Sequence, residues 1–127
     1  MNIAIWLVQV LVAIFFLFNG FMKTFLPIAD LSNQIPWVLD IPEALVRFIG
    51  IVELAGGLGV ILPAITRILP WVTVVAAGGL GTHMVLAVVF HISRGEFPNI
   101  ILPVIILALA AIIAYGRWKV VPINSRT

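Results

Sequence analysis

Two ionisable side chains lie well inside long apolar segments of this chain. Glu53 belongs to the segment at about 44–62, and His83 belongs to the segment at about 68–92. A charge in the interior of a membrane costs at least about 2.5 kcal/mol, so such residues seldom lack a function or a partner. A carboxyl and an imidazole can share a proton. Glu53 and His83 are therefore our candidate catalytic residues.

Both residues also have a structural interpretation. Glu53 could be a buried carboxyl that forms a hydrogen bond with a neighbouring helix. His83 could be a neutral imidazole that bonds across to a hydroxyl or a carbonyl group. Their residue types alone do not decide between chemistry and packing.

Further polar side chains gather where the apolar segments end, and they form our candidate ligand-binding set. This set contains Asn19, Lys23, Arg47, His91, Arg94 and Glu96. The alternative for the last three is a polar helix end that reaches into water. Arg47 could instead pair with Glu43 one turn earlier, or with Asp40 in the preceding loop.

The segments that must position these residues are transmembrane helices. Hydrophobic residues make up 63% of the 127-residue chain and charged residues only 9%, which excludes a soluble domain. A span needs about 20 mostly apolar residues. Four segments fit: about 3–22, 44–62, 68–92 and 100–115, with Pro63 closing the second. We predict an all-α fold, an integral membrane four-helix transmembrane bundle that forms a single domain over residues 1–127.

The segment at 23–43 is too short for a domain and too apolar for a free linker. It contains three prolines, with Trp37 among several large apolar residues. We expect it to lie at the membrane interface or to fold back over the bundle, with Trp37 at the level of the headgroups.

Helical geometry places Glu53 and His83 close together. Counting about 1.5 Å of rise per residue puts both roughly 12 Å below the same membrane boundary. Small and ionisable residues share one face of each helix, a pattern that lets membrane helices approach closely. These faces are formed by Gly50, Glu53 and Gly57 on one helix, and by Ala76, Gly79, His83, Ala87, His91 and Arg94 on the next.

Several classes of function are disfavoured by composition. The chain has no cysteine, so it can form neither a disulfide nor a thiolate-bound iron–sulfur cluster. Its net charge of +2 is too small and too dispersed for nucleic-acid binding. His83 and His91 lie on one helix without a third strong ligand nearby, so we expect no metal and no haem within one chain. A homodimer would change that expectation.

The distribution of basic residues predicts the orientation in the membrane. With four spans, both termini lie on one side, together with four basic residues: Arg67, Arg117, Lys119 and Arg126. The other side carries Lys23, Arg94 and Arg47, and every acidic residue except Glu53. The positive-inside rule therefore favours termini in the cytoplasm.

Three short motifs carry a resemblance to a known family. They are Asn19-Gly20-x-x-Lys23, then Gly50-x-x-Glu53-x-x-Gly57-x-Gly59, then His91-x-x-Arg94-Gly95-Glu96. In this order within four spans, they resemble the DoxX-like family of small four-helix bacterial membrane proteins. The resemblance implies a place in the bacterial cytoplasmic (inner) membrane and matches family positions at Lys23, Glu53, His91, Arg94 and Glu96. The candidacy of His83 comes from the residue analysis above.

The resemblance also implies a link to membrane redox systems. Our first hypothesis is a subunit of a redox or detoxification system that binds a quinone or similar apolar molecule in a polar pocket in the outer half of the bundle. The second is a non-catalytic protein that binds lipid or serves as a scaffold. The third is an acid-base enzyme acting on a hydrophobic substrate within the bilayer. The lipid bilayer is the expected environment, with a second copy of the chain or a membrane redox protein as candidate partner.

Overall fold

The computed structural model describes residues 2–126 and confirms an all-α membrane bundle. The long helices are α1 (Asn2–Phe25), α3 (Glu43–Thr66), α4 (Trp71–Ser93) and α5 (Ile101–Tyr115). A 3₁₀ turn, η2 (Phe97–Ile100), precedes α5, and a π-helical turn, η3 (Gly116–Val120), extends it. Four segments, the last formed by η2, α5 and η3 together, are long and apolar enough to cross a membrane.

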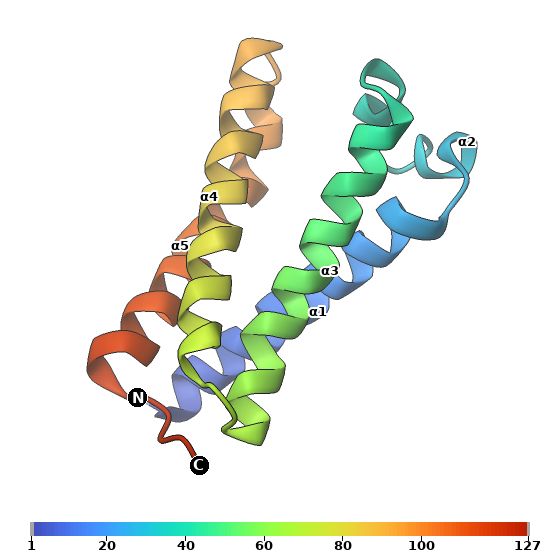
Figure 1. Ribbon diagram of the computed structural model, residues 1–127. Coiled ribbons are helices and arrows are strands. Elements are labelled where there is room, and N and C mark those ends of the chain that lie inside the picture. Colours follow the sequence, from blue (N-terminus) through green and yellow to red (C-terminus); the bar gives the residue numbers. More distant parts are fainter. Residues whose placement is uncertain (1, 127) are drawn as a thin grey trace.

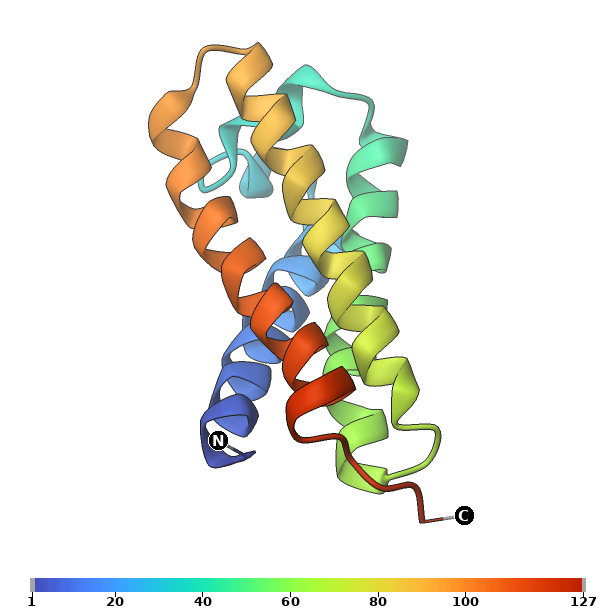
Figure 2. The same ribbon diagram turned by 90° about the vertical axis from the view of Figure 1, so that its left-hand side faces the viewer.

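The helices pack as two pairs, α1 with α3 and α4 with α5 (Figure 1). Both chain ends lie at the same end of the bundle in both views (Figure 2). We call this the terminal end and the opposite one the loop end. The two pairs are close at the terminal end and diverge toward the loop end (Figure 1).

A compact apolar core joins the four long helices. Its largest buried members include Phe16 of α1, Val60 of α3, Leu80 of α4 and Ile113 of α5. Many other large apolar side chains point outward, such as Ile3 at 76% exposure. In water this exposed surface would be unfavourable, whereas in a bilayer it contacts the lipid chains.

The connection between α1 and α3 folds back over the loop end. It contains a short helix, α2 (Ile28–Leu31), and a 3₁₀ turn, η1 (Pro36–Asp40). Leu31 and Val38 are buried against Met22 of α1 and Val46 of α3. The connection is therefore part of the folded structure, as expected if it covers the bundle.

Helix α3 continues beyond Pro63, where the sequence had suggested its end. Proline lacks an amide hydrogen and disturbs the helical hydrogen bonds one turn earlier. The carbonyl that loses its helical donor is that of Gly59. The next carbonyl, that of Val60, accepts hydrogen bonds from Gln9 Nε2 of α1 at 2.9 Å and from Thr73 Oγ1 of α4 at 3.4 Å. The helix ends at Thr66, and Arg67 adopts a left-handed conformation with φ of 57°.

Glycines allow α1 and α3 to approach closely. A Cβ atom added at Gly50 would lie 2.6 Å from Thr24 Oγ1 and 2.7 Å from the Thr24 nitrogen. One added at Gly20 would lie 2.7 Å from the Leu54 nitrogen. These contacts involve backbone atoms, which cannot move independently of the helix. The two helices therefore depend on the absence of side chains at this crossing.

We predict that Gly50→Ala destabilises the protein by about 1–3 kcal/mol, because α1 and α3 must separate to accept the methyl group. The matched control is Gly78→Ala on α4, where an added Cβ meets no atom within 4 Å. Unfolding of the purified proteins in mixed detergent micelles measures both effects. Equal stability of the two variants would contradict the proposed role of the glycine crossing.

Candidate functional site

A cavity of about 950 Å³ lies at the loop end, where the helix pairs diverge. Its lining comes from the long helices, from η2 and from the connection between α1 and α3. Most of the lining is apolar, including Val52, Leu86 and Phe90. Phe48 and Leu86 line it and are both more than 60% exposed, so the cavity reaches the surface that faces the lipid.

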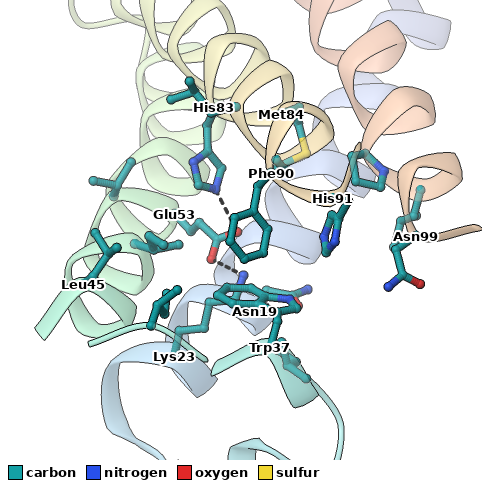
Figure 3. A pocket seen from close by; sticks show the side chains of 18 of the residues that line it. Asn19, Lys23, Trp37, Leu45, Glu53, His83, Met84, Phe90, His91 and Asn99 are labelled. Atoms are coloured by element: carbon teal, nitrogen blue, oxygen red, sulfur yellow. Dashed lines mark hydrogen bonds and ion pairs between the residues drawn. The ribbon is translucent and has the colours of Figure 1, made fainter. Parts of the chain in front are cut away.

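Lys23, Glu53 and His83 follow one another along the cavity (Figure 3). Lys23 Nζ donates a hydrogen bond of 2.8 Å to Glu53 Oε1. The second carboxylate oxygen, Oε2, lies 3.5 Å from His83 Nε2. The expected proximity of Glu53 and His83 is confirmed, and Lys23 is the closer partner of the carboxylate.

The close approach of α1 and α3 explains why Lys23 meets Glu53. Lys23 lies in the last turn of α1, and Glu53 lies one turn after Gly50 on α3. Both are buried, with exposed fractions of 7% for Lys23 and 1% for Glu53. The Lys23 ammonium also lies 5.5 Å from the centre of the Trp37 ring. A charge pair so far removed from water needs good geometry to offset its desolvation, and the short hydrogen bond supplies it.

His83 is positioned less tightly than Lys23. Its contact with Glu53 is longer than the usual hydrogen-bond range of about 2.7–3.2 Å. The imidazole packs against Phe16, with ring centres 6.3 Å apart, and its side chain keeps 18% of its surface exposed. His83 is therefore near the carboxylate and also open to a molecule in the cavity.

Aromatic residues from the connection and from α4 border the same space. The ring of Trp37 lies 5.6 Å from that of Phe90 in an edge-to-face contact, and Phe90 in turn contacts His91 (Figure 3). Asn99 of η2 also lines the cavity. The connection thus contributes a wall of the cavity as well as covering the bundle.

A group of charged residues, which we call the loop-end latch, ties that connection to the end of α4. It consists of Asp40, His91, Arg94 and Glu96. Glu96 Oε1 accepts a hydrogen bond from Arg94 Nε at 3.0 Å. The same oxygen lies 2.9 Å from His91 Nδ1. Arg94 also forms an ion pair with Asp40 of η1. The hydrogen bond with His91, followed by that with Arg94, lowers the pKa of Glu96. The bonds to Asp40 and then Glu96 raise the pKa of Arg94.

The structure brings five of the eight predicted site residues to the cavity: Asn19, Lys23, Glu53, His83 and His91. Asn19 Nδ2 donates to the Phe15 carbonyl within α1. The other three, Arg47, Arg94 and Glu96, do not belong to its described lining.

Arg47 closes the end of α1. Its Nη1 donates to the carbonyl of Lys23, in the last turn of α1, at 3.0 Å and to that of Leu26, just after the helix, at 2.6 Å. The last carbonyls of a helix have no partner within it. Glu43 lies 4.0 Å from Arg47 Nε, at the limit of an ion pair. Asp40 pairs with Arg94 instead of Arg47.

Sequence reasoning missed the direct pair of Lys23 and Glu53 and the walls formed by Trp37 and Phe90. The sequence does contain a pattern that indicates this pair. Lys23 is the only basic residue of α1, and Gly20 lies on the same helix face one turn earlier. No sequence pattern indicates the aromatic walls, since their positions depend on how the connection between α1 and α3 folds. Among the described residues, no group of three His, Cys, Asp or Glu side chains is placed to hold a metal ion.

Four membrane-spanning helices around a buried charge cluster define a small multi-pass integral membrane protein. The family model described as the DoxX-like family matches residues 7–113, and the chain belongs to this family. The matched region contains every candidate site residue, from Asn19 to Glu96. No curated protein and no solved structure matches the chain.

We predict that Lys23→Met and Glu53→Leu each destabilise the protein by about 3–5 kcal/mol, since each leaves an uncompensated buried charge. The double variant, which removes both charges, should recover most of this loss. Unfolding in mixed detergent micelles completes the double-mutant cycle. Simple addition of the two single losses would show that the pair is not energetically coupled.

The loop-end latch gives a prediction for acid stability. Because the folded state lowers the pKa of Glu96, the contribution of this residue is complete above the ordinary carboxyl range. It is lost as the pH falls through the lowered pKa. Between pH 7 and pH 3, Glu96→Gln should therefore lose less thermal stability than the unmodified protein. Asp30→Asn, which removes an exposed carboxylate of α2, serves as the control. Parallel curves for Glu96→Gln and the unmodified protein would refute the role of the latch.

Proposed function

We propose that this protein binds a quinone-like apolar molecule in the loop-end cavity, as the membrane subunit of a redox or detoxification system. The observation that carries the proposal is the row of Lys23, Glu53 and His83 along a largely apolar cavity. Small-molecule sites typically combine apolar walls with a few polar groups in this way. The membership in the DoxX-like family supports a membrane protein.

The residues present fit a quinone-like molecule. The cavity volume of about 950 Å³ lies within the usual range for such sites, about 300–1,000 Å³. Phe90, Trp37 and Val52 offer flat and aliphatic surfaces for a ring and a short tail. His83 offers an imidazole nitrogen for a carbonyl or hydroxyl oxygen. A bound quinone would supply the capacity for electron transfer.

Side chains of this protein would bind the polar end of the quinone and exchange its protons. Glu53 balances the charge of Lys23, and its second carboxylate oxygen lies 3.5 Å from His83 Nε2. The imidazole can donate or accept a proton at the cavity surface. The apolar walls exclude water from these groups, which strengthens their interactions.

We place the protein in the bacterial cytoplasmic membrane as one domain with both termini in the cytoplasm. The four basic residues counted for the terminal side support this orientation. The cavity then lies in the outer half of the bundle, open laterally to the lipid. An apolar ligand dissolved in the bilayer can enter by that route.

A non-catalytic role has one specific observation in its favour. Lys23 already satisfies the buried carboxylate of Glu53, as it would in a purely structural pair. In that case the cavity lining and its polar row would serve helix packing, and lipid tails would fill the space. The two functions differ in whether folded variants lose a ligand.

The test is titration of the purified protein with a short-chain benzoquinone, followed by native mass spectrometry. Glu53→Gln and His83→Ala should each weaken binding about tenfold, the effect of losing roughly one hydrogen bond. Thr73→Val, a buried change outside the lining of this cavity, is the matched control and should alter binding less than about twofold. Absence of quinone binding in the unmodified protein, or equal affinity in the folded variants, would refute the proposal and favour the scaffold role.

A further inference from the structure

A second buried charge lies at the terminal end of the bundle and is not used by the proposed function. Arg117 belongs to the π-helical turn η3 and is only 4% exposed. Gly116 lets this turn approach Ile5 of α1, since an added Cβ would lie 2.6 Å from the Ile5 side chain. The turn thereby places the guanidinium beside α1.

The polar partners of Arg117 within the described chain are all neutral. Nε donates to Gln9 Oε1 at 2.6 Å, and Nη1 donates to Asn2 Oδ1 at 2.7 Å and to the Val121 carbonyl at 2.9 Å. The guanidinium also lies 5.1 Å from the centre of the Trp6 ring. None of the ion pairs found among residues 2–126 includes Arg117.

One nitrogen of Arg117 remains without a partner. Nη2 is buried and makes no hydrogen bond within the described residues. Leaving a buried donor unsatisfied is unfavourable, and a buried positive charge without a negative partner is more so. The buried guanidinium thus keeps one donor for which residues 2–126 supply no acceptor.

A cavity of about 470 Å³ lies at the same end of the bundle. It is lined by Arg117 and also by Arg67, whose side chain comes from the left-handed end of α3. The described lining contains no acidic residue. Two arginines without an acid form a strongly positive site, and the planar guanidinium group suits the oxygens of a phosphate.

We propose that Arg67 and Arg117 bind the phosphate group of an anionic membrane lipid. The cavity is bordered by Trp6 and by Ile65, which is 62% exposed on the face of α3 that contacts lipid. A headgroup held at the arginines therefore has its acyl chains beside an apolar surface. In the proposed orientation this end faces the cytoplasmic leaflet, where basic pockets between helices recognise anionic headgroups.

The test compares three probes on the delipidated protein: phosphatidylglycerol, phosphatidylcholine and inorganic phosphate. Native mass spectrometry should show phosphatidylglycerol binding at least about tenfold tighter than phosphatidylcholine. Arg67→Gln, a change of an exposed side chain, should lose about tenfold in phosphatidylglycerol affinity. Arg117→Lys, which keeps the charge and removes the planar fork, should show a similar loss.

Lys119→Gln is the matched control, because it removes a positive charge from η3 outside the cavity lining. An equal loss in this control would overturn the site in favour of general attraction to basic residues. Inorganic phosphate that binds as tightly as phosphatidylglycerol, with the same dependence on Arg67, would overturn the lipid as its source. Quinone binding at the loop end should be unchanged in Arg67→Gln, so this test is separate from that of the proposed function.

Discussion

The buried ion pair between Lys23 and Glu53 is the interaction on which the loop end of the molecule depends. Neither charge is tolerable alone in an apolar bundle, so α1 and α3 must hold the two groups within hydrogen-bond distance. That requirement explains the glycine crossing at Gly20 and Gly50, where no side chain separates the helices. The connection that follows α1 then folds over the same end, with Trp37 beside the Lys23 ammonium.

Tight packing of α1 on α3 and of α4 on α5 leaves the loop end open between the two pairs. Toward the terminal end the helices share an apolar core around Phe16 and Ile113. The resulting cavity has apolar walls, a satisfied carboxylate and an accessible imidazole. Three members of the loop-end latch, Arg94, Glu96 and Asp40, connect the outer wall of the cavity to the end of α4 through ion pairs. Stability and binding capacity thus arise from one arrangement of charges.

Buried positive charges have different partners at the two ends of the bundle. At the loop end each buried or partly buried cation has a carboxylate nearby, as Lys23 has Glu53. At the terminal end Arg117 donates to amide and carbonyl oxygens, and its Nη2 has no partner among the described residues. This asymmetry follows the sequence, since four of the five acids lie at the loop-end edge and the fifth is Glu53. An external anion would complete the terminal end as Glu53 completes the other.

The sequence by itself determined the class, the four spans and the family, because hydropathy and short motifs are local properties of the chain. It also placed Glu53 and His83 at one depth, since helical rise is constant. Only the tertiary structure decided that Lys23 is the partner of Glu53, that Arg47 caps α1, and that Trp37 lines the cavity. Those relations depend on which helices become neighbours and on how an irregular connection folds. The same holds for Arg117, which the sequence presents as part of a basic tail and which the fold buries beside Gln9.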